Sequence, residues 1–330
     1  MNAIHPSWPL PLGVLLALCL GRAAAYPIDA YPETGIARLE GYLLAQLGKV
    51  SGNRLPSGAQ LKTDAIRLRL EDRPGFETPT PDPGLTRRIV DMLGAEARDY
   101  SISLLDLSDP EAPLYAEHNG DALRNPGSVG KLMVGLALFQ ALADLYPDDI
   151  ESRKRILRDS MVRVDGFIHK EHHEVPFWKP GEDRIARRRL REGDTANLWT
   201  FLDWMFSASS NGAATMVIKQ LMLLRRFGTA YPVDPARADA FFRDTSPREL
   251  GQLLVEALTK PVTRNGLDVE RLRQGSFFSA TAKRRVPGTN SVSTTRELIR
   301  YLVKMEEGRL VDPWSSLEMK RYLYMTKRRM

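Results

Sequence analysis

Ser128 and Lys131 have the residue types and the spacing needed for nucleophilic catalysis. Residues three apart on a helix share one face, so the Lys131 amine can reach the Ser128 hydroxyl. A serine hydroxyl becomes a good nucleophile when a neighbouring base takes its proton, and lysine can be that base when burial lowers its pKa. Free backbone N–H groups at a helix start can also stabilise an oxyanion. The alternative is a serine and a lysine that face solvent at the start of a helix.

The stretch after this pair predicts a buried helix. Residues 132–145 are apolar around almost the whole helical wheel, and a helix that is apolar on all sides belongs in a protein interior. A Pro-Gly turn at residues 126–127 precedes Ser128, and Pro147 ends the helix because the residue before a proline avoids the α region. Ser128 is therefore expected in the first turn of a helix that runs through the middle of a domain.

A second polar loop lies between two further apolar helices. Residues 198–206 are almost wholly apolar, the polar loop covers residues 207–212, and the next helix is expected over residues 213–225. A polar loop held between buried helices can direct side chains into a site. The alternative is that Ser209 and Asn211 only end and start helices as cap and turn residues.

Ser128-x-x-Lys131, followed by Ser209-Ser210-Asn211 between two helices, resembles the serine β-lactamase and penicillin-binding protein superfamily. The similarity is greatest to its class A-like branch and covers about residues 85–330. It implies an α+β fold of the β-lactamase/transpeptidase type, in which a helical subdomain packs on an antiparallel sheet.

The resemblance gives each motif residue an implied role. Ser128 would be the nucleophile that forms an acyl-enzyme, and its own backbone N–H would be half of the oxyanion hole. Lys131 would be the base for acylation, Ser209 would relay a proton to the leaving nitrogen, and Asn211 would bind the substrate's amide side chain. No cofactor and no metal ion is implied.

Two departures from the family pattern bear on function. The Lys-Thr/Ser-Gly motif of a sheet strand is absent, and two helices predicted over residues 294–327 occupy the end of the chain. We therefore expect the C-terminal strands of the sheet to be missing, as in a C-terminally truncated chain. The family's Glu-x-x-Leu-Asn is also absent between the second motif and residue 294, since none of the glutamates there has that sequel: Glu249, Glu256 and Glu270. An acyl-enzyme should then persist, which favours a peptidase, esterase or amidase over an efficient antibiotic-hydrolysing β-lactamase.

The chain of 330 residues is long enough for one large domain with an extension, or for two modest domains. Residues 1–25 resemble an export signal, because the apolar run over residues 10–20 is too short to span a bilayer and Ala23-Ala24-Ala25 fits a cleavage site. Residues 26–84 are expected to form an N-terminal extension that ends in a proline-rich linker. Residues 85–330 are expected to form the hydrolase domain, incomplete at its C-terminus.

Charge and cysteine content narrow the classes of function. The sequence has 47 Lys and Arg residues against 41 Asp and Glu residues, and a net charge this mildly basic does not indicate a particular binding partner. Cys19 is the single cysteine, so neither a disulfide framework nor a cysteine zinc site is possible. We expect a periplasmic or secreted protein with no transmembrane segment after signal cleavage. Its substrate would be a small molecule, a peptide-like compound or a cell-envelope polymer, and export disfavours nucleic acid as a partner.

Residues 147–193 are polar and irregular, and they are expected to lie outside the core. His169 and His173 could share a helix face and bind zinc, with His172 as a further candidate. A solvated loop is the preferred interpretation, because apparent metal spacings arise by chance. Five arginines between residues 184 and 191 are likewise interpreted as a solvated face.

Three functions follow from these patterns. The first is an exported serine hydrolase that acts through an acyl-enzyme on Ser128. The second is a non-catalytic binding or sensor protein of the cell envelope that keeps the pocket without turnover. The third is a zinc hydrolase that uses the histidines near residue 170.

Overall fold

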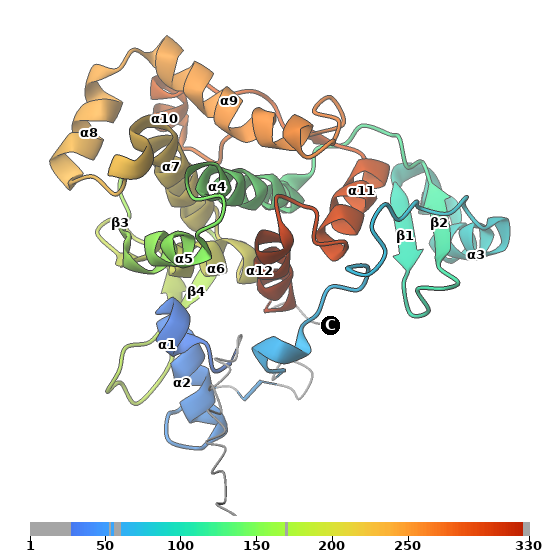
Figure 1. Cartoon of the computed structure of the whole chain (residues 1–330), viewed down its shortest axis with the longest axis horizontal. Coiled ribbons are helices and arrows are strands. Elements are labelled where there is room, and N and C mark those ends of the chain that lie inside the picture. The colour runs from blue at the N-terminus through green and yellow to red at the C-terminus, as the bar shows by residue number, and fades with distance from the viewer. Residues whose placement is uncertain (1–27, 53, 56–60, 169–170, 326–330) are drawn as a thin grey trace, which may run out of the picture.

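The apolar run after Ser128 forms a central helix, α4 (Lys131–Leu145), which continues a short 3₁₀ helix, η4 (Gly127–Gly130). The computed structural model describes residues 28–325 except 53, 56–60 and 169–170, so the predicted export signal lies outside the described residues. Within the described part, one stretch, Gly127–Leu145, is long and apolar enough to cross a membrane, and 72% of it is buried. Other helices surround α4 (Figure 1), so its apolar surface belongs to the core of the molecule.

The helices around α4 supply most of the hydrophobic core. Those in contact with it are α6 (Leu198–Ser207), α7 (Asn211–Phe227), α9 (Pro247–Arg264) and α12 (Pro313–Tyr324). The remaining α-helices are α1 (Tyr31–Thr34), α2 (Ala37–Gln46), α3 (Pro83–Leu93), α5 (Ile150–Asp159), α8 (Pro235–Asp244), α10 (Ala280–Arg285) and α11 (Thr295–Glu306). The two apolar helices that flank the polar loop, α6 and α7, form as expected from their sequence.

The strands are short and pair in twos. Among the described residues they form four antiparallel sheets: β1 (Ile102–Asp106) with β2 (Leu114–His118), β3 (Met161–Arg163) with β6 (Thr195–Asn197), β4 (Glu174–Phe177) with β5 (Ala186–Arg189), and β7 (Leu272–Arg273) with β8 (Val292–Ser293). The molecule therefore mixes helices with small antiparallel sheets. It differs from the expected fold in that the described strands do not join into one sheet beneath a helical subdomain.

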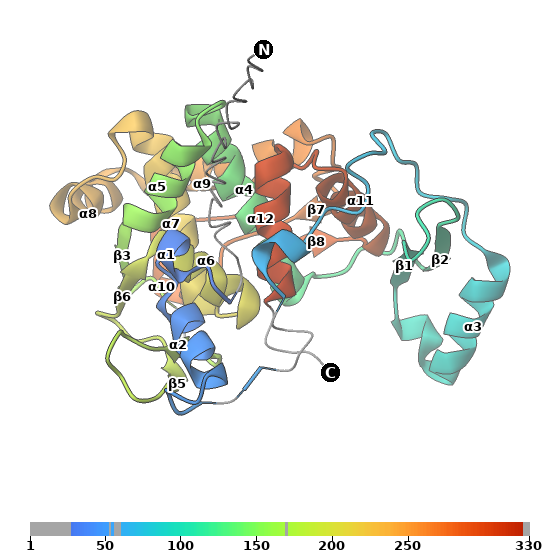
Figure 2. The same cartoon turned by 60° about the horizontal axis from the view of Figure 1, so that its bottom comes forward.

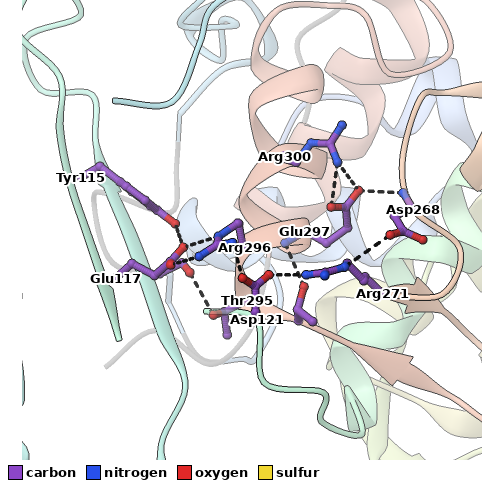
Figure 3. Close-up of polar contacts among 11 residues, drawn as sticks. Tyr115, Glu117, Asp121, Asp268, Arg271, Thr295, Arg296, Glu297 and Arg300 are labelled. Atoms are coloured by element: carbon purple, nitrogen blue, oxygen red, sulfur yellow. Dashed lines mark hydrogen bonds and ion pairs between the residues drawn. The ribbon is translucent and has the colours of Figure 1, made fainter. Parts of the chain in front are cut away.

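The β1–β2 hairpin lies at the side of the molecule, between α11 and α3 (Figure 2). Figure 3 shows the ion pairs that tie it to α11, in which Arg296 bonds both Glu117 of β2 and Asp121 of the following turn. Asp121 also pairs with Arg271, which comes just before β7. The hydrogen bond from Arg296 lowers the pKa of Glu117, although burial opposes it. This network holds in place the chain segment that leads to Ser128.

Part of the predicted N-terminal extension packs into the main core. Ala30, Ile36 and Leu39 belong to the same hydrophobic cluster as α4. The Arg38 guanidinium in α2 donates two hydrogen bonds of 2.5 Å to Asp203 of α6, and both side chains are buried. Residues 28–46 thus support the helices that carry the polar loop.

The prediction that residues 147–193 lie outside the core is wrong for much of this segment. It contains α5 and three short strands, and several of its apolar side chains are buried: Leu157, Val162, Val164, Val175, Trp178 and Leu190. Strands this short place only one or two residues on an inner face, so the sequence shows no clear alternation. Arginines fill three of the four positions of β5, a composition typical of a solvated segment, although Arg187 and Arg188 are half-buried.

Candidate active site

A turn at Gly127 places Ser128 at the surface and at the start of its helix. Gly127 has a left-handed φ of 53°, and its backbone N–H donates to Asn125 Oδ1 at 2.9 Å. The following residues form a 3₁₀ turn in place of the expected first α-helical turn, and side chains three apart eclipse each other in that geometry. The exposed Ser128 hydroxyl therefore lies directly over the position of Lys131.

The Lys131 amine lies within hydrogen-bond distance of three polar side chains. Its Nζ is 3.1 Å from Ser128 Oγ, 3.4 Å from Ser209 Oγ and 2.7 Å from Asn211 Oδ1. The structure thus brings together all four residues that the sequence motifs single out. The ring of Phe277, which sequence reasoning missed, lies 4.5 Å from the same Nζ.

Burial lowers the pKa of Lys131 to about 8, although the negative charge of Glu171 opposes this change. The side chain is only 2% exposed, so little water reaches the ammonium. An amine with this pKa is neutral in an appreciable fraction of molecules near pH 7, and a neutral amine can accept a proton. The site therefore pairs an exposed hydroxyl with a buried amine that can act as its base.

The backbone at the start of the helix supplies a donor for a developing negative charge. The Val129 N–H is bonded to Pro126 O at 3.1 Å and closes the first turn. The Ser128 N–H precedes that turn, where helix geometry provides no acceptor. This N–H can therefore be directed at the oxygen of a carbonyl group that Ser128 attacks.

Ser209 is held in an unfavourable backbone conformation. Its φ is 58°, in the left-handed region that costs a residue with a Cβ about 1–2 kcal/mol. Strain of this kind persists only where the surrounding structure holds it, and it clusters at functional sites. The next residue, Ser210, caps α7 by accepting the Ala213 N–H at 3.0 Å.

We expect Ser209→Gly to be more stable than Ser209→Ala by about 1 kcal/mol, because both lose the hydroxyl and only glycine relieves the left-handed strain. Urea unfolding of the two variants measures this difference. Both should react with an acylating probe more slowly than the parent protein. Equal stability of the two variants would show that the backbone at this position is not strained.

A carboxylate that the sequence analysis assigned to a solvated loop is buried beside the second motif. Glu171 is 6% exposed and accepts hydrogen bonds of 2.6 Å from Ser210 Oγ and from the Gly212 N–H. The solvated-loop interpretation is therefore wrong at this residue. Its hydrogen bonds make the burial of this carboxylate possible. Unlike the burial of one face of a helix or strand, they produce no periodic spacing of residues in the sequence.

The segment after β7 also lines the site and was missed. Gln274 is 3% exposed, and its Nε2 donates to Gly275 O and to Ser291 Oγ. Its Oε1 lies so close to Gly130 that a Cβ there would be 1.5 Å away. At position 130, between the serine and the lysine, a residue larger than glycine would therefore clash with the Gln274 amide.

We expect Gly130→Ala to lower the free energy of unfolding by about 1–2 kcal/mol, because the new methyl group displaces the Gln274 amide from its hydrogen bonds. In a Gln274→Ala background, the same substitution should have little effect or stabilise the helix. A double-mutant cycle followed by urea unfolding measures this coupling. An identical loss in both backgrounds would contradict the packing described.

The zinc alternative gains no support from the described residues. No group of three or more His, Cys, Asp or Glu side chains that could hold a metal ion occurs among them. His173 Nδ1 is 3.1 Å from Glu171 Oε1, and its partner in the predicted pair, His169, lies outside the described residues.

Comparisons with known proteins give little further information about the function of this site. The sequence matches no family model, and no curated protein matches it. Among solved structures, the chain is similar to a β-lactamase from Sphaerobacter thermophilus DSM 20745, with 15% sequence identity and a TM-score of 0.44. The similarity covers 76% of this chain and 71% of the other. A likeness at this level assigns neither a fold nor a function to the chain.

Proposed function

We propose that this chain is an exported serine hydrolase of the β-lactamase-like kind, which acts on an amide or ester through an acyl-enzyme on Ser128. The observation that carries the proposal is the position of the Lys131 amine, 3.1 Å from Ser128 Oγ and within reach of Ser209 and Asn211. The lowered pKa of Lys131 supports its role as the base. Solvent-facing residues at a helix start would show neither the burial of the lysine nor these contacts.

In the proposed reaction, neutral Lys131 takes the hydroxyl proton as Ser128 Oγ attacks the substrate carbonyl carbon. The carbonyl oxygen becomes an oxyanion that the Ser128 N–H can stabilise. When the bond to the leaving nitrogen or oxygen breaks, the proton passes from Lys131 through the Ser209 hydroxyl to the leaving group. The acyl group stays on Ser128 until water releases it, and Asn211 holds the substrate's amide group.

Deacylation is expected to be slow in this protein. The sequence between Asn211 and Thr294 has no Glu-x-x-Leu-Asn, and both oxygens of the buried Glu171 already accept hydrogen bonds. A peptidase, esterase or amidase that acts on a small or peptide-like compound of the cell envelope fits this site better than an efficient antibiotic hydrolase. We extend the proposal to a periplasmic or secreted location, on the basis of the signal-like residues 1–25.

An activated p-nitrophenyl ester tests this function. We expect a burst of about one equivalent of nitrophenol per protein, followed by slow turnover, because acylation outpaces release of the acyl group. The burst should be absent in Ser128→Ala and kept in Ser108→Ala, a matched change of an exposed serine in the turn after β1. A burst of parental size in Ser128→Ala would refute the proposal, and the absence of any burst would favour the non-catalytic binding protein.

A further inference from the structure

Glu171 holds the loop of the second motif from the inner side. Its Oε2 accepts from Ser210 Oγ and from the Gly212 N–H, each at 2.6 Å. Its Oε1 accepts from the backbone N–H groups of His172 and His173, each at 2.8 Å. These hydrogen bonds lower the pKa of the carboxyl group although burial raises it, so Glu171 is a carboxylate at neutral pH. Because both oxygens are engaged, this group is suited to hold structure and not to accept a proton.

The two donors to Glu171 Oε2, the Ser210 hydroxyl and the Gly212 N–H, lie on either side of Asn211, and Ser210 directly follows Ser209. Their bonds to one buried carboxylate fix the backbone over residues 210–212, from which the Asn211 side chain reaches Lys131. They also hold the preceding residue in its left-handed conformation, which would relax without support. A Cβ on Gly212 would lie 3.1 Å from Glu171 Oε2, so the backbone is packed tightly against this carboxylate.

Glu171 also acts on the proposed base through its charge. The side chains that contact the Lys131 amine are neutral: Ser128, Ser209, Asn211 and Phe277. The charge of Glu171 raises the pKa of Lys131 against the effect of burial. The groups that face the carboxylate itself are the Ser210 hydroxyl, the ring of His173, and the backbone N–H groups of His172, His173 and Gly212.

We propose that Glu171 is the positioning residue of this site, because its hydrogen bonds to Ser210 and Gly212 anchor the loop that presents Ser209 and Asn211 to the Lys131 amine. The proposal rests on the proposed function in that it takes Lys131 as the base. The charge of Glu171 also acts on the protonation of the lysine, and this effect can be separated from the anchoring by experiment.

The test compares Glu171→Gln with Glu174→Gln, a matched change of an exposed glutamate three residues along the chain. NMR of protein labelled with isotopes in its lysines gives the pKa of Lys131, whose signal is assigned by its absence in Lys131→Met. We expect Glu171→Gln to lower this pKa by about one unit, because an opposite charge is lost. It should also slow labelling of Ser128 by a fluorophosphonate at least tenfold at a pH above both pKa values, because the loop is misplaced. Glu174→Gln should change neither quantity.

A second variant separates the two effects. Ser210→Ala removes one anchor and keeps the charge, so labelling should slow while the pKa of Lys131 stays at about 8. If Glu171→Gln does not fold, Glu171→Asp replaces it, because it shortens the side chain by one methylene and keeps the charge. As for Ser210→Ala, we expect slower labelling and an unchanged pKa of Lys131. Parental labelling rates in both variants would overturn the anchoring role.

The outcomes also distinguish this inference from the proposed function. If the parent protein is not labelled, and the pKa of Lys131 is nevertheless lower in Glu171→Gln than in the parent, the hydrolase proposal is refuted while the charge effect of Glu171 stands. A labelled parent, together with a folded Glu171→Gln variant of unchanged pKa and labelling rate, would overturn the role of Glu171 alone.

Discussion

Lys131→Met is expected to slow the acylation of Ser128 by about 10²–10⁴-fold, the usual contribution of a positioned general base. Methionine has a similar length but cannot take the hydroxyl proton, which Lys131 receives across 3.1 Å. The time course of labelling by a fluorophosphonate or a fluorescent penicillin measures the rate. In the parent protein, this rate should rise with pH and reach half its maximum at about pH 8, where the amine loses its proton.

The matched control for this experiment is Lys260→Met, because Lys260 is an exposed lysine that pairs with Glu256 on the surface of α9. The Lys260→Met protein should be labelled on Ser128 at the parental rate and with the parental pH dependence. If Lys131→Met also reacted at the parental rate, another group would be the base, and the contacts of the amine would be structural.

The same substitution is expected to stabilise the folded protein by about 2–3 kcal/mol at neutral pH. The pKa of Lys131 is about 8 in the folded state and near 10.5 in an unfolded chain. Each unit of difference in pKa corresponds to about 1.4 kcal/mol of stability that the buried charge costs the parent protein. Methionine recovers only part of this free energy, because it leaves the hydrogen-bond partners of the amine unpaired. Urea unfolding of parent and variant across a range of pH measures the effect.

The sign of the pH dependence is a sharper test than the size of the effect. Below pH 8, the lysine is protonated in both states, and the folded state bears the full penalty of a buried charge. Between pH 8 and 10.5 the unfolded chain holds the proton that the folded protein has lost, so the stability of the parent rises with pH. The advantage of Lys131→Met should therefore shrink through this range and disappear above it. A constant advantage across the range would mean that the lysine has an ordinary pKa.

The sequence was informative where a single residue type or a strong pattern decides the structure. Residues 132–145 are apolar on every side, which leaves only the interior for their helix, and that helix places Ser128 and Lys131 together. The polar loop between α6 and α7 lies against the same lysine, as the pairing of the two motifs implied. The helix follows from a short-range pattern, whereas the contact between Lys131 and the loop, which lies 78 to 80 positions further along the chain, was expected only from the resemblance of the two motifs to a known superfamily.

The missed parts of the site depend on contacts between distant segments. Glu171 meets Ser210 across 39 positions of the sequence, and nothing in a short polar run distinguishes a buried carboxylate from a solvated one. Gln274 packs against Gly130 from a segment with little regular structure. The pairing of β3 with β6 and of β7 with β8 was missed for a related reason, since a strand of two or three residues carries no period by which its partner could be inferred.

The most direct test of the nucleophile and base pair is to locate a covalent adduct. The parent protein is incubated with a fluorophosphonate at pH 8.5, and the modified residue is identified by mass spectrometry of its peptides. The site described predicts one adduct per chain, on Ser128, with none on the protein that carries Ser128→Ala. An adduct on another serine, or no adduct on a correctly folded parent, would contradict it.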